Sequence, residues 1–89
     1  MRYYLYMLYS EKHDIIYKGV TANLDLRYTQ HQQGKSRYTK HRGPWTFVFV
    51  KEFPSKSLAL KEERRLKHQR RNYLEHLICS EENLLLTLK

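Results

Sequence analysis

The stretch YYLYMLYSEKHDIIYKGV, from Tyr3 to Val20, decides the fold because it joins two apolar segments through a polar one. Tyr3–Tyr9 and Ile15–Val20 are rich in aromatic and aliphatic residues, which predicts two strands. The polar residues 10–14 between them predict a turn, so the stretch indicates a β-hairpin.

Both faces of this hairpin are apolar. Successive strand side chains point to opposite faces, so Tyr6 lies on one face and Leu5 and Met7 on the other. A loop with an even number of residues, such as Ser10–His13, would place Tyr6 directly opposite Tyr17 on one face. A five-residue loop would put the two tyrosines on different faces. Because both faces of the hairpin are apolar, we expect a sheet that is covered on both sides.

A helix and a third strand are predicted next. Asn23 is a suitable N-cap for a helix over Leu24–Gln33, and Gly34 is a suitable stop. A basic loop then leads to Trp45–Lys51, where aromatic residues alternate with valines. This pattern predicts a strand with two apolar faces.

The C-terminal third of the chain predicts two more helices. Ser55 or Ser57 caps a helix that reaches about Gln69. A further helix begins near Asn72, because Asn72 and Glu75 have the spacing of a capping box.

The predicted order is strand, strand, helix, strand, helix, helix, which favours an α+β fold on a small antiparallel sheet. The 89 residues suffice for one core. We expect a single domain over residues 1–79, followed by a C-terminal tail over residues 80–89 whose structure the sequence does not decide.

Composition limits the classes of partner. The formal net charge of +8 attracts polyanions, and nucleic acid is the first candidate. An anionic membrane ranks behind it, because no basic helix with a clean apolar face stands out. Cys79 is the only cysteine and no signal peptide is visible, so we expect a cytoplasmic protein. The leucine-rich run Leu84–Leu88 is too short to cross a bilayer.

Some side chains are suited to phosphate chemistry. Arg27 and His31 are four residues apart on the first predicted helix, so they project together. An arginine can hold a phosphate, and a histidine can position or deprotonate a water. A solvated helix face that happens to carry both residues is the alternative.

Two neighbouring acids on the second predicted helix are candidates for a metal ligand. Glu62 and Glu63 both flank its apolar stripe, so helical periodicity cannot choose between them. One carboxylate could suffice for Mg²⁺, which keeps several waters and takes phosphate oxygens as ligands. In the alternative interpretation, both acids pair with nearby lysines and arginines.

The loop between the first helix and the third strand is basic and contains an aromatic residue, which suits a phosphate backbone. A merely solvated charge run is equally compatible with it. The histidines and the cysteine show no zinc spacing, and no glycine-rich phosphate cradle or serine elbow is present. The candidate nucleic-acid-binding residues are Lys35, Arg37, Tyr38, Lys40, Arg42 and Lys67.

Several short motifs in this order, spread over Tyr3–Ile78, resemble the GIY-YIG nuclease superfamily. The likeness is to its small single-domain bacterial members, which are similar to the N-terminal domain of excinuclease C. It rests on Tyr4-Leu5-Tyr6, Tyr17-Lys18-Gly19, Asn23-Leu24 through Arg27 and His31, Gly34-Lys35, Tyr38-Thr39, Pro44-Trp45, and Ser57-Leu58-Ala59 through Glu63 to Lys67.

The resemblance implies a role for each site residue. Tyr6 and Tyr17 would line the active site, and Arg27 would hold the scissile phosphate. His31 would assist proton handling, and either it or Tyr17 would be the general base. Glu63, chosen over Glu62 by the resemblance alone, would bind Mg²⁺ or Mn²⁺. The resemblance also implies a three-stranded antiparallel sheet flanked by helices.

The function expected from this resemblance is a metal-dependent endonuclease that hydrolyses DNA phosphodiester bonds in repair or recombination. Two positions depart from the family pattern: Tyr4 stands where glycine is frequent, and Lys18 stands where an aliphatic residue is usual. The alternative is a non-catalytic nucleic-acid-binding module that keeps the fold. An RNA-directed partner of ribosomal or repair machinery is a weaker third interpretation.

Overall fold

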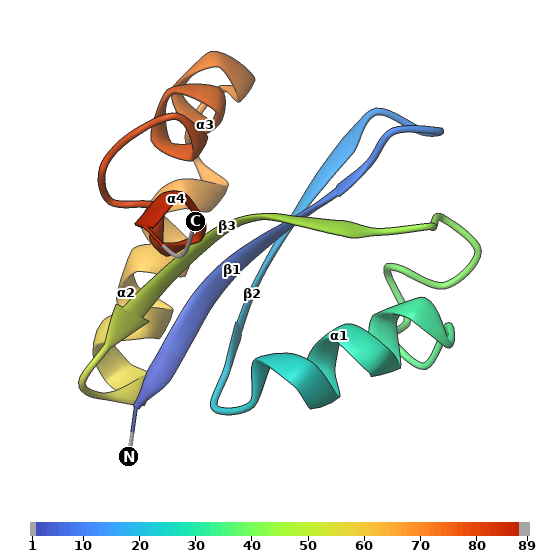
Figure 1. The fold of residues 1–89 in the computed structure, drawn as a ribbon, viewed down its shortest axis with the longest axis horizontal. Helices are drawn as coiled ribbons and strands as arrows, with labels where there is room; N and C mark the ends of the chain where they lie inside the picture. The colour runs from blue at the N-terminus through green and yellow to red at the C-terminus, as the bar shows by residue number, and fades with distance from the viewer. Residues whose placement is uncertain (1, 88–89) are drawn as a thin grey trace.

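The computed structural model describes residues 2–87, and the last two residues of the predicted tail lie outside this range. Its three strands form one antiparallel sheet in the order β2-β1-β3, so the predicted α+β class is confirmed (Figure 1). The elements are β1 (Tyr3–Ser10), β2 (Ile15–Thr21), α1 (Leu24–Gln32), β3 (Thr46–Phe53), α2 (Lys56–Lys67), α3 (Arg71–Ile78) and α4 (Leu84–Thr87).

The hairpin register is shifted by two residues from the predicted one. β1 extends to Ser10, which pairs with Ile15 across a four-residue turn. Tyr6 therefore faces Gly19 instead of Tyr17. An even loop still keeps the two tyrosines on one face, as predicted, but the prediction that they lie directly opposite is wrong. The physical reason is that the Ser10 hydroxyl donates to the Arg42 carbonyl at 2.6 Å, which holds Ser10 in the sheet.

Helices cover both faces of the sheet, as the apolar pattern predicts. On one face, α2 and α3 pack on a core that includes Leu5 and Met7. On the other face, residues of α1 and α4 pack on a core built around Tyr6 and Trp45. Figure 1 shows α2 and α1 on different sides of the twisted strands. The sheet is thus the middle layer.

A β-bulge in β3 distributes its aromatic residues over both cores. Phe49 pairs with Met7, whereas Phe47 pairs with Leu8, so Val48 is an extra residue between them. Phe47 consequently packs in the core with Tyr6, and Phe49 in the core with Leu5. Simple alternation would have placed both rings on one face.

The ends of α1 are fixed as the sequence predicts. The Asn23 side chain accepts the Leu26 amide at 3.1 Å, and Gly34 follows the helix with φ 73°. The Gly34 amide donates to the His31 carbonyl at 3.2 Å and the Lys35 amide to the Gln30 carbonyl at 2.9 Å. These two bonds form a Schellman motif, which requires a left-handed residue and so favours glycine. They fix the point where the basic loop leaves the helix.

The caps of the later helices resolve one open prediction and correct another. Ser55, and not Ser57, caps α2 by accepting the Leu58 amide at 3.3 Å. The capping box at Asn72 is wrong, because α3 begins at Arg71 and Asn72 lies inside it. Glu75 pairs with Arg71 at 3.3 Å.

The two outer edges of the sheet have different surroundings. Asn83 is fully buried and covers the edge of β3, where it accepts the Val50 amide at 3.2 Å and donates to the Val48 carbonyl at 2.8 Å. It also donates to the Ile78 carbonyl and accepts the Leu85 amide, so it ties α3 and α4 to the sheet. The other edge is β2, which pairs with β1 alone among the described strands.

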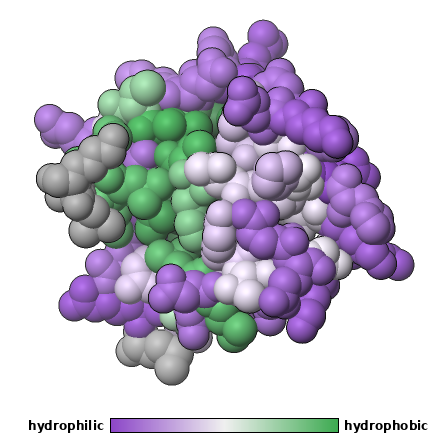
Figure 2. Space-filling model, turned by 45° about the vertical axis from the view of Figure 1, so that its right-hand side comes forward, coloured by the Kyte–Doolittle hydropathy of each residue, from purple (hydrophilic) through white to green (hydrophobic). Residues whose placement is uncertain are grey.

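The surface is mixed in polarity. The face in Figure 2 has an apolar area bordered by hydrophilic side chains. Over residues 2–87, each helix is too short or too polar to span a membrane.

Candidate active site

Tyr6 fills the space that Gly19 leaves on the neighbouring strand. Its side chain is completely buried, and a Cβ atom added at Gly19 would lie only 2.5 Å from Tyr6 Cζ. The glycine therefore permits the close approach of the phenol ring across the strand pair. Tyr6 Oη is held at the level of β2, facing α1.

Four side chains, that of Tyr6 included, form one chain of polar contacts that passes through this phenol. Arg27 Nε donates to Tyr6 Oη at 3.2 Å, and Tyr6 Oη lies 2.8 Å from His31 Nε2. His31 Nδ1 lies 2.6 Å from Thr39 Oγ1. The chain of contacts connects β1, α1 and the basic loop, so it positions Arg27 relative to the hairpin.

The donors in this chain assign the tautomer of His31. Arginine can only donate, so Tyr6 Oη accepts from Arg27 and its own proton needs another acceptor. In the buried site that acceptor is His31 Nε2, which must be unprotonated. His31 then carries its proton on Nδ1 and donates it to Thr39 Oγ1.

Burial keeps the members of this chain in fixed protonation states. Burial, together with the charge of Arg27, lowers the pKa of His31 to about 4, so the imidazole is neutral at pH 7. Burial raises the pKa of Tyr6 to about 12, although Arg27 opposes it. Burial lowers the pKa of Arg27, but hydrogen bonding to Tyr6 and interaction with Tyr17 outweigh it, and the guanidinium stays charged.

Tyr17 lies beside this chain, on the outer strand β2. Its ring centroid is 5.1 Å from that of His31 and 5.3 Å from that of Tyr38, which stacks on it at 25°. The Arg42 guanidinium lies 5.0 Å from the Tyr38 centroid. Tyr17 is only partly buried, whereas Tyr6 is completely buried. Tyr17 is thus the phenol that reaches the surface.

A groove of about 280 Å³ crosses the edge of β2, and both Tyr17 and residues of α2 line it. Glu63 projects into it with 15% of its side chain exposed, and Lys67 Nζ lies 3.7 Å from Glu63 Oε1. Glu62 instead forms a two-pronged ion pair with Arg65 at 2.7 and 2.8 Å outside the groove. The structure thus distinguishes Glu63, which lines the groove, from Glu62, which does not. Helical periodicity could not make this choice. The groove is lined by Ile16, Tyr17, Lys18, Tyr38, Glu63 and Lys67.

Lys18 is half-buried in the same groove. It pairs with Met7 in the sheet, so its side chain leaves the strand on the side of α2. Burial and then the charge of Lys67 lower the pKa of Lys18, and Glu63 partly offsets them. The lysine that departs from the family pattern therefore lies near the candidate metal ligand.

The donor set suits a magnesium ion that keeps most of its water. Within residues 2–87, no cluster of three or more His, Cys, Asp or Glu side chains could hold a metal ion. Glu63 could supply one carboxylate ligand, and Mg²⁺ commonly takes its remaining ligands from water and phosphate oxygens. The residues therefore fit a metal that is completed by its substrate, and they do not fit a closed protein cage.

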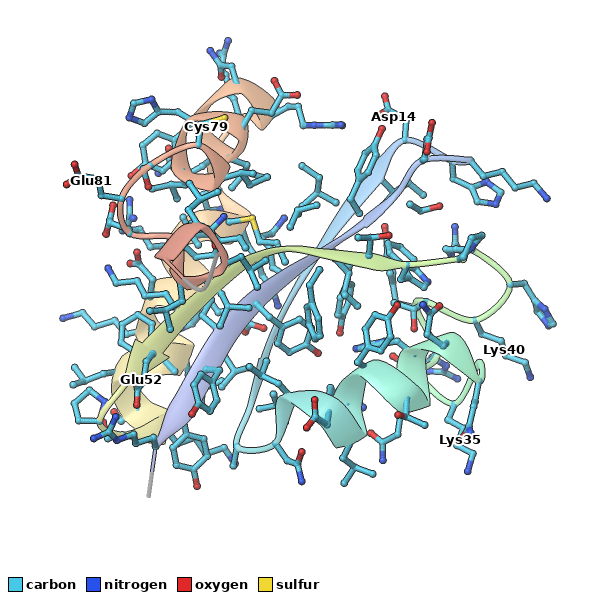
Figure 3. The ribbon with its side chains drawn as sticks, in the orientation of Figure 1. Asp14, Lys35, Lys40, Glu52, Cys79 and Glu81 are labelled. Carbon is cyan, nitrogen blue, oxygen red and sulfur yellow. The ribbon has the colours of Figure 1, made fainter. Side chains whose placement is uncertain are left out.

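The candidate nucleic-acid-binding residues divide into two groups. Tyr38 and Lys67 line the groove. Figure 3 shows Lys35 and Lys40 beyond the C-terminal end of α1, pointing away from the sheet. Arg37 and Arg42 are exposed on the same loop, and Arg42 contacts Tyr38.

Sequence reasoning missed two residues that build the site. Thr39 is buried and accepts from His31, and its carbonyl accepts the Trp45 indole N–H at 3.1 Å. These two residues, Thr39 and Trp45, enter the sequence analysis only as parts of a motif. The signal that could have found Thr39 is an uncharged residue inside a basic loop, which favours contact with the protein over contact with solvent.

Fold and site together define the class. Residues 2–76 match the GIY-YIG catalytic domain, so the chain belongs to the GIY-YIG nuclease superfamily, as the motifs predict.

The individual relatives are small proteins of similar length. UPF0213 protein OB0043 of Oceanobacillus iheyensis is 40% identical over 67 residues, which cover 74% of this chain and 77% of the relative. UPF0213 protein BH0048 of Halalkalibacterium halodurans is 38% identical over 79 residues, which cover 88% and 83%. The solution NMR structure of UPF0213 protein BH0048 from Bacillus halodurans matches the fold with a TM-score of 0.59 at 35% identity, covering 92% of this chain and 87% of that chain. None of these names states an activity.

Proposed function

We propose that this protein is a metal-dependent endonuclease that hydrolyses phosphodiester bonds of DNA and acts in DNA repair or recombination in the cytoplasm. The observation that carries the proposal is the groove over β2, which joins Tyr17 to Glu63. Behind it, the hydrogen-bonded chain through Tyr6 and His31 holds Arg27 in place. Together these groups offer a phosphate-binding cation, a phenol and a carboxylate.

Arg27 is the residue proposed to bind the scissile phosphate. Its charge is maintained, and its Nε and Nη1 are fixed by Tyr6 and by Gln30 at 3.2 and 3.1 Å. A fixed guanidinium stabilises the negative charge that develops on phosphorus oxygens during attack, and it needs little reorganisation to do so. Tyr6 is a positioning residue in this proposal.

Tyr17 is the better candidate for handling the proton of the attacking water. His31 is only 2% exposed and both of its ring nitrogens are engaged, so it has no position for a water or a substrate. Tyr6 is equally enclosed. Tyr17 reaches the groove and lies close to Arg27 and His31. In this proposal His31 acts through Tyr6: it accepts the Tyr6 hydroxyl proton and so fixes the direction in which that hydroxyl points.

Glu63 would hold Mg²⁺ or Mn²⁺ in the groove. When bound there, such an ion would supply polarisation of a phosphate oxygen and stabilisation of the leaving 3′-oxygen. Glu63 keeps its carboxylate at the rim of the groove, 15% exposed, where a hydrated ion and a phosphate can reach it.

A nicking assay on supercoiled plasmid and on a panel of branched and linear DNA, with Mg²⁺, Mn²⁺ or EDTA, tests the proposal. We expect Glu63→Gln and Arg27→Ala to slow cleavage by roughly 100-fold or more, since removing one electrostatic contact to a transition state commonly costs that much. Glu62→Gln is the matched control and should cleave normally, because Glu62 pairs with Arg65 outside the groove. Equal losses in both Glu variants, or cleavage that survives EDTA, would refute the assigned site. The repair role would fail if cells lacking the protein survived DNA damage as well as wild type.

One observation favours a second function, nucleic-acid binding without cleavage. Lys67 pairs with Glu63, and Lys18 lies in the same groove, so two cations surround the carboxylate. Binding that weakens steeply with salt, with no nicked product under any metal, would support this module.

A further inference from the structure

Two lysines compete with any metal ion for Glu63. Lys67 follows Glu63 by one helical turn and lies 3.7 Å from its carboxylate. Lys18 comes from the opposite wall, on β2, and lines the same groove of about 280 Å³. Within residues 2–87, Lys67 is the only cation at ion-pair distance from Glu63.

The charges in the groove do not balance without a further anion. One carboxylate faces two ammonium groups, and each ammonium is strongly hydrated in water. A divalent cation that binds the Glu63 carboxylate removes the ion-pair partner of Lys67 and adds two positive charges beside Lys18. Like charges in a partly buried site repel strongly, so the metal alone binds poorly.

A nucleic-acid strand supplies the missing anions. Each phosphate carries one negative charge, and lysine is a suitable point charge for phosphate. A strand in the groove can pair with Lys67, which the metal displaces from Glu63, and with the neighbouring Lys18. Its phosphate oxygens can also complete the coordination of the metal. Metal and strand therefore each satisfy the charges that the other leaves unpaired.

We propose that Lys67 pairs with Glu63 in the free protein while Lys18 lies beside this pair, and that both lysines turn to the nucleic-acid backbone when a divalent cation binds Glu63, so that metal and nucleic acid bind cooperatively. This inference rests on the proposed function. It assigns Lys18 as a positioning residue that makes metal binding depend on the substrate. Binding linkage is reciprocal, so the strand must tighten the metal by the same factor as the metal tightens the strand.

The test measures Mn²⁺ binding directly, by the EPR signal of free Mn²⁺, without relying on cleavage. The protein is titrated alone and with a short branched DNA that carries non-cleavable phosphorothioate linkages. Glu63→Gln with the same DNA gives the background from Mn²⁺ bound to DNA. For the wild type we expect the DNA to tighten Mn²⁺ binding by about tenfold, within the usual range of coupling between sites.

Lys18→Met is the informative variant, because it keeps the length of the apolar stem and removes the charge. We expect it to bind Mn²⁺ in the absence of DNA about fivefold more tightly than the wild type, and to lose most of the coupling. Lys61→Met on the exposed side of α2 is the control and should match the wild type, because Lys61 does not line the groove. A thermal melt of each variant shows that it is folded.

The outcomes separate the inference from the proposed function. If Mn²⁺ binding requires Glu63 but is the same with and without DNA, or is unchanged in Lys18→Met, the inference is overturned and the nuclease proposal stands. If Glu63→Gln does not change Mn²⁺ binding, both the metal ligand and the inference are wrong. Tighter metal binding in Lys18→Met with reduced coupling supports the inference even if cleavage is not observed.

Discussion

The buried His31 should make the stability of this protein depend on pH between about 4 and 6.5, the pKa values of the folded and unfolded imidazole. The folded protein holds the imidazole neutral, whereas the unfolded chain binds a proton in this range. Because the unfolded state binds more protons, stability falls as the pH falls. The contribution of His31 is fully present above pH 6.5 and is lost progressively below it.

The size of the effect follows from the two pKa values. A difference of roughly 2.5 pH units corresponds to about 3 kcal/mol, of which about 2 kcal/mol is lost between pH 7.5 and pH 5. The side chain is 2% exposed, so solvent screening does little to reduce this value. For a domain of this length, 2 kcal/mol corresponds to a fall in melting temperature of roughly 10 °C.

Urea unfolding of the wild type and of His31→Gln at both pH values isolates this contribution. The variant loses the titrating group, so we expect its stability to fall by about 2 kcal/mol less than that of the wild type on acidification. An NMR titration of the wild type checks the same point without a variant: the His31 ring signals should stay constant down to pH 5. Parallel pH curves for the two proteins, or a His31 signal that titrates near 6.5, would refute the reasoning.

Three further predictions concern close packing and buried hydrogen bonds. Gly19→Ala should destabilise the protein by about 1–3 kcal/mol in urea unfolding, because the added Cβ meets the Tyr6 ring, and Tyr6→Leu should recover part of this cost; additive losses would contradict the steric argument. Asn83→Ala should cost about 2–4 kcal/mol in thermal unfolding, since it leaves buried backbone groups at the β3 edge unpaired. The exposed Asn72→Ala is its control, and equal melting temperatures for the two variants would disprove this role. Thr39→Val removes the oxygen that accepts from the buried imidazole. It should lower stability by about 1–2 kcal/mol and change the ¹⁵N shift of the imidazole Nδ1, and an unchanged shift would show that the tautomer assignment is wrong.

The shared face of Tyr6 and Tyr17 could be predicted because side-chain alternation depends only on residue parity. Their register could not, because it depends on Ser10, whose hydroxyl bonds to Arg42 far along the chain. The caps at Asn23 and Ser55 involve only neighbouring residues, which explains why the sequence identifies the first and restricts the second to two choices.

Burial explains the remaining differences at the site. His31 has the spacing of a residue that could deprotonate a water, yet Thr39 and Tyr6 enclose both of its nitrogens. No local pattern shows that a loop residue will cover a helix. Similarly, the Asn72 capping motif resembles a helix start, but α3 begins at Arg71, whose side chain pairs with Asp14 of the hairpin at 2.7 Å. For His31, contacts between distant segments decide the outcome.

Among the described strands, β2 has no partner on its outer side, next to the groove, a feature that often invites strand-to-strand association between molecules. A lysine within such a strand opposes strand-to-strand association, because a second chain added there would have to bury an ammonium group. Lys18 thus disfavours sheet extension at this edge, while the asparagine at the opposite margin does the same by covering its backbone. Replacing this lysine with the aliphatic residue usual in the family would then carry a risk of self-association, and the concentration dependence of size for such a variant would reveal it.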